Sequence, residues 1–230
     1  RISVLAKREL SSLDNADEQD LRLGELEAAR RITGKKVFSL KQVHGTDAVQ
    51  VEDKSQQTGI YFAEADAVFT SRKDVALMVR TADCLPLFFE GRGEETWVGV
   101  IHAGWRGLAA GIIQSTLSRV IELGKIATLK IAPGPCISGK NYEVGLEVSE
   151  RFRVKESKGA KFHVDLIENA KEQWNFPGVQ IELLEDFRGC PVDNNDLYYS
   201  HRKGDMGRNL NLIHIEDENA GFERRAGRVQ

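Results

Sequence analysis

The sequence is poor in several residue types and patterns, and each shortage excludes a class of protein. Three cysteines among 230 residues are too few for a disulfide framework and suit a reducing, cytoplasmic compartment. No apolar run approaches the roughly 18 to 20 residues that cross a bilayer, because Arg80 and Asp83 interrupt the stretch 75–89. A net charge of −3 offers no basic surface, so neither nucleic acid nor an anionic membrane is an expected partner.

What remains is the composition of an ordinary globular protein. Apolar residues make up 41% of the chain and charged residues 29%, which is typical of a folded domain. The length suffices for one large buried core, and no internal repeat, low-complexity stretch or long linker divides the sequence. We therefore expect a single domain over residues 1–230, with a charged, frayed tail over 216–230.

The hydrophobic pattern predicts strands in runs with helices added between and after them. Amphipathic stretches predict helices over 17–31 and 107–123, the second ending at Gly124. Further helices are expected over 143–153 and 165–174. Strands are expected over 37–43, 48–51, 66–70, 75–81, 85–89, 97–102, 130–132, 179–184 and 210–215.

Short polar connections between these strands favour antiparallel neighbours. In particular, we expect 48–51 to pair back on 37–43 as a hairpin. The fold class predicted from this order is α+β, with mixed, largely antiparallel β-sheets flanked by helices.

Three side chains suited to chemistry lie where predicted strands end: His44, Cys84 and His102. Cysteine and histidine are preferred zinc ligands, and three protein ligands leave a fourth position for water or substrate. The same groups also allow a nucleophilic Cys84 with His102 as its base, and the sequence does not separate the two uses. Asp83 is a proton carrier, a partner for a histidine, or merely a turn residue. Five histidines without a His-x-His pair argue against a multicopper oxidase.

Cationic residues beside two glycine-containing loops are candidates for substrate binding. Arg106 lies at the start of the helix predicted over 107–123, where free N–H groups and a guanidinium suit phosphate or carboxylate. Arg202 and Arg208 lie in the loop 199–208, which could close over an anionic or polar ligand. In both loops the alternative is structural, with glycines that permit tight packing and cations that are simply solvated.

Five segments, taken together and in this order, carry a specific resemblance to a known family. They are Lys41-Gln42-Val43-His44-Gly45, Ala65-Asp66-Ala67-Val68-Phe69-Thr70, Thr81-Ala82-Asp83-Cys84-Leu85-Pro86, Val100-Ile101-His102-Ala103-Gly104-Trp105-Arg106-Gly107 and Ile131-Ala132-Pro133-Gly134-Pro135-Cys136-Ile137. The chain resembles the YfiH-type purine nucleoside phosphorylase family, also called laccase-domain or polyphenol-oxidase-like proteins. Where the family has Phe-Ser-Tyr-Arg-Arg near its C-terminus, this chain reads Tyr199-Ser200-His201-Arg202-Lys203.

The resemblance implies a fold similar to cysteine hydrolases and one zinc ion, or alternatively copper, held by His44, Cys84 and His102. It implies phosphorolysis of adenosine, inosine, guanosine and methylthioadenosine, plus deamination of adenosine. A metal-independent Cys–His hydrolase acting on peptidoglycan precursors and a laccase-like polyphenol oxidase are the alternatives that the family leaves open. On this basis the expected catalytic residues are Cys84, His102, Asp83 and Arg106, and the expected residues for binding nucleoside and phosphate are Gln42, Arg106, Arg202 and Arg208.

Overall fold

The computed structural model describes residues 1–13, 16–53, 55–56, 59–158, 161–184 and 189–216. Of the tail that we expect to fray, residues 217–230 lie outside the described residues. Among the described residues, no helix combines the length and the apolar character needed to cross a membrane. The α+β class with mixed, largely antiparallel sheets and flanking helices is confirmed.

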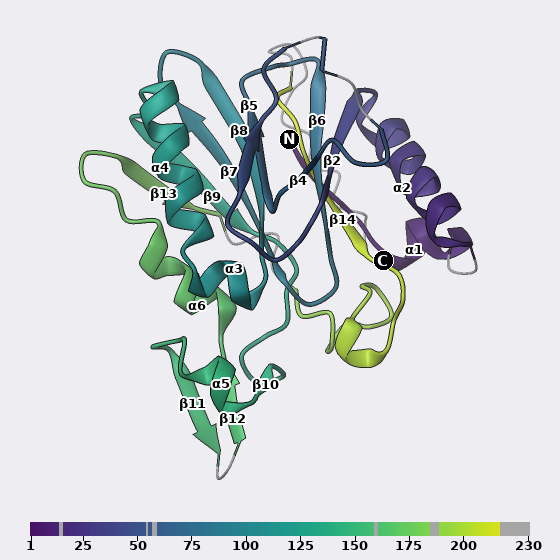
Figure 1. Ribbon diagram of the computed structural model, residues 1–230, viewed down its shortest axis with the longest axis vertical. Helices are drawn as coiled ribbons and strands as arrows, with labels where there is room; N and C mark the ends of the chain where they lie inside the picture. Colours follow the sequence, from purple (N-terminus) through teal and green to yellow (C-terminus); the bar gives the residue numbers. More distant parts are fainter. Residues whose placement is uncertain (14–15, 54, 57–58, 159–160, 185–188, 217–230) are drawn as a thin grey trace.

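Two large sheets and one small sheet contain the strands of the described part of the chain (Figure 1). The six-stranded sheet has the order β13 (Gln180–Leu183), β9 (Thr128–Pro133), β7 (Leu85–Arg92), β8 (Thr96–Ala103), β5 (Ala67–Thr70) and β3 (Ala48–Gln50). The five-stranded sheet has the order β1 (Ile2–Leu5), β14 (Asn209–Ile213), β6 (Val75–Thr81), β2 (Lys36–Lys41) and β4 (Ala63–Glu64). The small sheet has the order β10 (Glu143–Val144), β12 (Lys161–Val164) and β11 (Lys155–Lys158).

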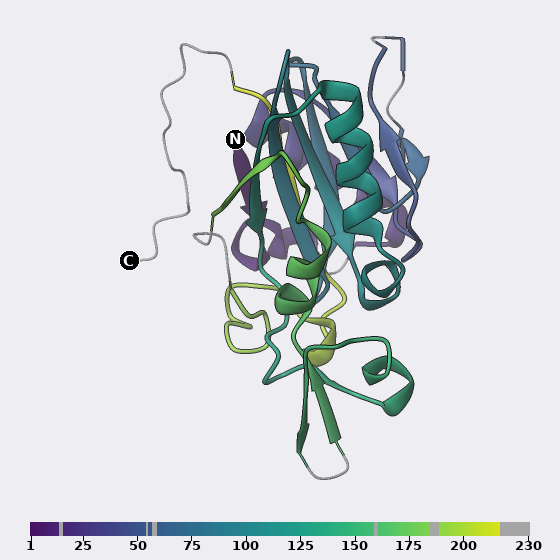
Figure 2. The same ribbon diagram turned by 90° about the vertical axis from the view of Figure 1, so that its left-hand side faces the viewer.

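The helices cover the outer faces of the two large sheets, so the body has four layers (Figures 1 and 2). On the six-stranded sheet lie α3 (Trp105–Ala109), α4 (Ile112–Gly124) and α6 (Leu166–Ala170). On the five-stranded sheet lie α1 (Lys7–Leu10) and α2 (Glu18–Thr33). The small sheet, with α5 (Leu146–Ser149), extends from one end of this body (Figure 1).

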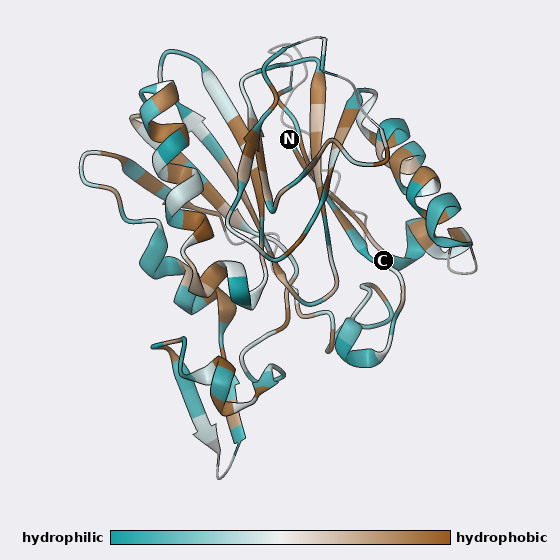
Figure 3. Ribbon diagram, viewed as in Figure 1, coloured by the Kyte–Doolittle hydropathy of each residue, from teal (hydrophilic) through white to brown (hydrophobic). Residues whose placement is uncertain are grey.

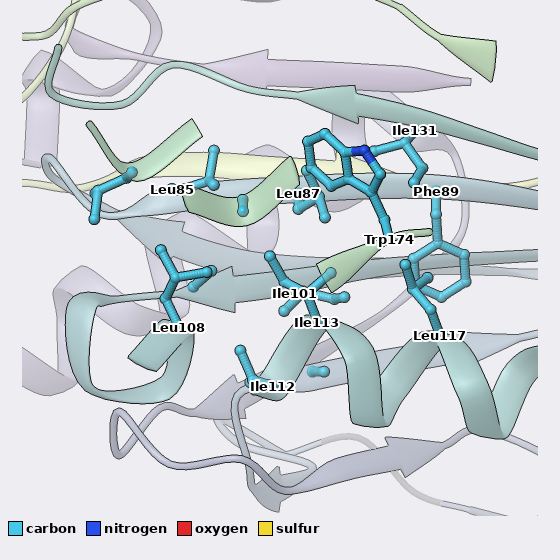
Figure 4. Packing of buried hydrophobic residues seen from close by; sticks show 14 of the residues in the cluster. Leu85, Leu87, Phe89, Ile101, Leu108, Ile112, Ile113, Leu117, Ile131 and Trp174 are labelled. Carbon is cyan, nitrogen blue, oxygen red and sulfur yellow. The ribbon is translucent and has the colours of Figure 1, made fainter. Parts of the chain in front are cut away.

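The side chains of each central strand alternate between the core that lies between the two sheets and the core under the helices of its own sheet. Along β7, Leu85, Leu87 and Phe89 pack under the helices, as Figure 4 shows, whereas Phe88 points into the core between the sheets. Along β6, Leu77 lies in the inter-sheet core. Because both faces are covered, these strands read as continuous apolar runs in the sequence, and Figure 3 shows hydrophobic residues concentrated in them.

This packing brings three chain connections to one edge of the body. Leu85 at the start of β7 pairs with Ala103 at the end of β8. Residues 82–84 connect β6 in one sheet to β7 in the other, and Asp83 adopts a left-handed φ of 88° in this crossing. The end of β2 reaches the same place through the segment 42–45, since the Val43 and Gly45 N–H groups hydrogen-bond the Asp66 side chain just before β5.

Two predicted helices differ from the observed ones. The range 107–123 forms α3 and α4, because Gly111 adopts a left-handed φ of 87° between them; α4 does end at Gly124. The range 143–153 contains β10 and the short α5, because Glu143 and Val144 pair with β12. The range 165–174 is helical as expected, with α6 continuing into a 3-10 turn over Lys171–Gln173.

The predicted hairpin of 48–51 with 37–43 is wrong. Strand β3 pairs in parallel with β5, whereas β2 belongs to the other sheet and pairs with β6. The short connections after β5 and after β6 also cross between the sheets, while β7 and β8 are antiparallel neighbours as expected. The length of a connection does not predict strand pairing here, because a short loop can also lead from one stacked sheet to the other.

Replacing Leu77 by alanine should destabilise the protein strongly, because this fully buried side chain fills the core between the sheets. We expect the free energy of unfolding to fall by about 2–5 kcal/mol. Leu123→Ala on α4, where 50% of the residue is exposed, is the matched control and should cost less than about 1 kcal/mol. Chemical denaturation measures both, and equal losses would contradict the inter-sheet packing.

Candidate metal centre

His44, Cys84 and His102 meet at the edge where these three connections converge. Their candidate ligand atoms all lie within 4.8 Å of one another, and Cys84 Sγ is 4.0 Å from His44 Nε2. The two imidazole rings are 4.8 Å apart between centroids and nearly perpendicular. His102 is buried, Cys84 is half-buried and His44 is exposed, so this histidine–cysteine cluster is closed on one side and open on the other.

Gly104 leaves room for the cluster. A Cβ atom at this position would lie 2.7 Å from His44 Cδ2 and 3.3 Å from Cys84 Sγ, closer to the histidine than real side-chain contacts allow. The three donor groups therefore lie close to the backbone of Gly104, which has no side chain to displace them. One thiolate and two imidazoles at this spacing are a donor set that fits a single zinc ion with one position open.

A buried carboxylate, Asp66, contacts both histidines. Its Oδ1 accepts hydrogen bonds from His102 Nδ1 at 2.7 Å and from the His44 backbone N–H at 2.9 Å. Its Oδ2 accepts from the Val43 and Gly45 N–H groups at 3.1 and 2.8 Å. The carboxylate in contact with His102 is thus Asp66, and the role predicted for Asp83 stays a prediction.

The backbone at His44 adopts an uncommon conformation, and the nearby residue Gln42 anchors this segment. His44 has a φ of 59°, in the left-handed region that non-glycine residues seldom occupy. Preceding it, Gln42 forms two hydrogen bonds with the Arg80 backbone, donating to its carbonyl and accepting from its N–H, both at 2.8 Å. Both functional groups of the Gln42 amide contact the Arg80 backbone, so Gln42 anchors the His44 loop, and its predicted role in substrate binding stays a prediction.

The cluster carries a charge-separated pair in the metal-free protein. Burial by itself would raise the pKa of the Cys84 thiol, but hydrogen bonds from His102 and His44 outweigh it and lower this pKa to about 6. Burial would likewise lower the pKa of His102, yet hydrogen bonds to Asp66 and Cys84 raise it to about 9. The thiolate is the form of cysteine that binds a metal and also the form that acts as a nucleophile.

A series of contacts runs from Asp83, next to Cys84 in the sequence, through Arg202 to Tyr142. The Asp83 Oδ2 accepts a hydrogen bond from the Arg202 backbone N–H at 2.7 Å, while its buried Oδ1 has no partner among the described residues. The Arg202 guanidinium donates to the Glu143 carbonyl and lies 5.5 Å from the centroid of the Tyr142 ring. Burial and the negative charge of Cys84 raise the pKa of Tyr142 to about 12.

The two remaining predicted substrate-binding arginines differ in their surroundings. Arg106 is exposed, stacks 4.4 Å from the Trp105 ring centroid, and has no hydrogen-bond or ion-pair partner for its guanidinium among the described residues. Arg208 instead donates through Nη1 to the carbonyls of Met206 and Gly207, both at 2.8 Å. Arg208 thus stabilises its own loop through Nη1, and its predicted contact with substrate stays a prediction.

Sequence reasoning missed Asp66 and Tyr142. Asp66 was visible as an acid inside the apolar segment 65–70, and a charged residue in a buried strand requires partners. Tyr142 directly precedes the range 143–153, whose first residues we predicted to be helical but which form strand β10. No local pattern signals the contact of Tyr142 with Arg202, because the two residues are far apart in the sequence.

Comparison with known proteins extends over most of the chain. Residues 9–216 match the family model described as multi-copper polyphenol oxidoreductase laccase. A protein of Aquifex aeolicus named purine nucleoside phosphorylase is 40% identical over 184 residues, which cover 77% of this chain and 83% of the relative. Purine nucleoside phosphorylase YfiH of Escherichia coli K12 is 32% identical over 200 residues, which cover 83% and 77% respectively.

Solved structures share the fold. A Neisseria meningitidis protein assigned to DUF152 superposes with a TM-score of 0.74 at 29% identity, covering 94% of this chain and 91% of that protein. The hypothetical protein YfiH of Bacillus licheniformis gives a TM-score of 0.75 at 22% identity, covering 89% and 86%. The architecture of two stacked sheets is therefore not peculiar to this sequence.

Alkylation of metal-free protein should detect the activated thiol. The rate at which iodoacetamide labels Cys84 should have its midpoint near pH 6, since the thiolate is the reactive form and is lost as the pH falls through the pKa. Peptide mass spectrometry separates Cys84 from the buried Cys136, which serves as the internal control. A midpoint near the ordinary thiol pKa of 9 would contradict the hydrogen bonds assigned to Cys84.

Gly104→Ala should weaken metal binding without unfolding the protein, because the new methyl group would displace the His44 ring. We expect at least a tenfold loss of zinc affinity, measured by competition with a chromophoric chelator. Gly59→Ala is the matched control, since its Cβ would meet nothing closer than 3.6 Å. Unchanged affinity in Gly104→Ala would show that the cluster is not arranged around this glycine.

Proposed function

The chain belongs to the YfiH-type purine nucleoside phosphorylase family, described also as multi-copper polyphenol oxidoreductase laccase, and we propose that it is a zinc-dependent purine nucleoside phosphorylase that also deaminates adenosine. The observation that carries this proposal is the cluster of His44, Cys84 and His102 within 4.8 Å. The proposed substrates are adenosine, inosine, guanosine and methylthioadenosine, together with phosphate.

The three cluster residues would hold the ion in this proposal. When bound, zinc supplies a Lewis acid with one position open to water or substrate. His44 and His102 bind through neutral ring nitrogens and Cys84 through its thiolate, which is already favoured at neutral pH. Copper is the alternative ion, because two histidines and one cysteine also suit copper. Laccase chemistry has less support, since this cluster is the one group of such donors found among the described residues.

Arg106 is the proposed phosphate-binding residue. Its guanidinium is exposed, has no hydrogen-bond partner among the described residues, and lies over the Trp105 ring. A guanidinium placed in this way presents a fork that matches phosphate oxygens. In phosphorolysis a phosphate oxygen attacks C1′ of the ribose, the bond from C1′ to the purine nitrogen breaks, and the purine leaves with a proton. Arg106 would hold the attacking phosphate near C1′.

Arg202 and Tyr142 would form the side of the site that receives the nucleoside. The Arg202 guanidinium lies over the Tyr142 ring, and an aromatic ring and a guanidinium are both groups against which a flat purine can stack. Asp83 would remain the proposed proton carrier, since it precedes Cys84 directly and its Oδ1 is unpaired among the described residues. In the deaminase reaction, water replaces the amino group at C6 of adenosine and ammonia leaves.

A second candidate function rests on one specific observation. The thiolate of Cys84 beside the protonated His102 is the arrangement of a cysteine hydrolase, which would cleave an amide such as one in a peptidoglycan precursor without metal. The two candidates differ in their response to chelation. Full nucleoside turnover after exhaustive removal of metal would exclude the zinc mechanism, whereas amidase activity that survives it would favour the hydrolase.

Cys84→Ala should abolish phosphorolysis and deamination while leaving the fold intact, because the substitution removes a metal ligand from the surface edge of the body. We expect at least a thousandfold loss of kcat/KM for inosine with phosphate and for adenosine without it, with an unchanged circular dichroism spectrum. Cys190→Ala, at a half-buried cysteine outside the cluster, is the matched control and should retain activity. Wild-type turnover of inosine and adenosine by Cys84→Ala would refute the zinc mechanism.

A further inference from the structure

Asp66 is bound by four donors that come from two separate parts of the chain. Three are consecutive backbone N–H groups, those of Val43, His44 and Gly45, and the fourth is His102 Nδ1. The residue is fully buried. A carboxylate has about four lone-pair positions for hydrogen bonds, so this one is fully occupied.

The contact with His102 decides which ring nitrogen can bind a metal. Because Asp66 Oδ1 accepts a hydrogen bond, His102 Nδ1 must carry a proton. The lone pair available to an ion is therefore the one on Nε2, the nitrogen that remains. A backbone hydrogen bond also keeps the two residues side by side, since the His102 N–H donates to the Asp66 carbonyl at 2.7 Å.

The contacts with the loop decide where His44 lies. A non-glycine residue at a φ of 59° costs free energy, and three N–H groups that converge on one carboxylate offset that cost. Such a concave run of N–H groups is a binding arrangement for a negative charge. Here the charge is the Asp66 side chain itself, so the loop is fastened to the same atoms that orient His102.

We infer that Asp66 is a positioning residue that sets both histidines of the cluster at once, fixing the Nε2 of His102 as a ligand and holding His44 within reach of the same ion. This inference rests on the proposed metal site and extends it. Partners of this kind in the layer behind metal ligands typically contribute a factor of about 10 to 100 in affinity. Its distinctive feature is that one side chain serves two ligands that are distant in the sequence.

The test is zinc affinity in Asp66→Asn. An amide has one acceptor oxygen, so at most two of the four donors keep an acceptor, and the NH2 group opposes the others. We expect zinc affinity, measured by chelator competition, to fall by about 10- to 100-fold. Asp47→Asn is the matched control, because this exposed aspartate borders the same loop, and its affinity should stay within about twofold of wild type.

Two further measurements separate positioning from general destabilisation. In a His44→Ala background, Asp66→Asn should cost less affinity than in wild type, since part of its effect acts through the His44 loop; equal losses in both backgrounds would overturn the coupling. In the zinc-loaded wild-type protein, which requires no variant to fold, nitrogen-15 spectra should show His102 protonated at Nδ1. Hydrogen exchange should show protected amides at residues 43–45.

The outcomes distinguish this inference from the proposed function. Wild-type protein that binds zinc but turns over no nucleoside would contradict the function and leave the role of Asp66 supported by the affinity data. Equal zinc affinities of wild type and Asp66→Asn, or His102 protonated at Nε2, would overturn the role of Asp66 whether or not nucleosides are substrates.

Discussion

The face-to-face packing of two sheets is the constraint on which the site depends. Since the six-stranded and five-stranded sheets bury apolar side chains against each other, the ends of their strands are held in fixed relation. The crossing from β6 to β7 places Cys84 beside the end of β8, and the loop after β2 reaches the same edge. Residues 40 positions apart thereby come within contact distance.

Around this edge the environment changes from buried to exposed over a short distance. Asp66 and His102 are buried, Cys84 is half-buried and His44 is exposed, so the donors are fixed from behind and accessible from the front. Tyr142 lies close enough to Cys84, Arg202 and Arg106 for their charges to affect its pKa, and both arginines are exposed. A rigid inner layer and a polar outer layer are what a site that must both hold an ion and admit a substrate requires.

The sequence revealed the parts of this arrangement that follow from local chemistry. The amphipathic pattern of helix α2 and the apolar runs of strands β5 to β8 are visible in the sequence, and the donor types of His44, Cys84 and His102 identified these three residues as a group. Contacts from side chain to distant backbone leave no such pattern. The anchoring of Gln42 on Arg80, the four donors on Asp66 and the left-handed Gly111 within a predicted helix all depend on tertiary geometry, so sequence reasoning misassigned or missed them.

The central claim is that one sulfur and two imidazoles bind the same metal ion. X-ray absorption at the zinc edge, on protein purified without added metal, tests it most directly. We expect about one zinc per chain with one sulfur at about 2.3 Å and two nitrogens at about 2.0–2.1 Å, plus one further light atom. Zinc that has no sulfur neighbour, or protein that contains no stoichiometric metal, would contradict the account.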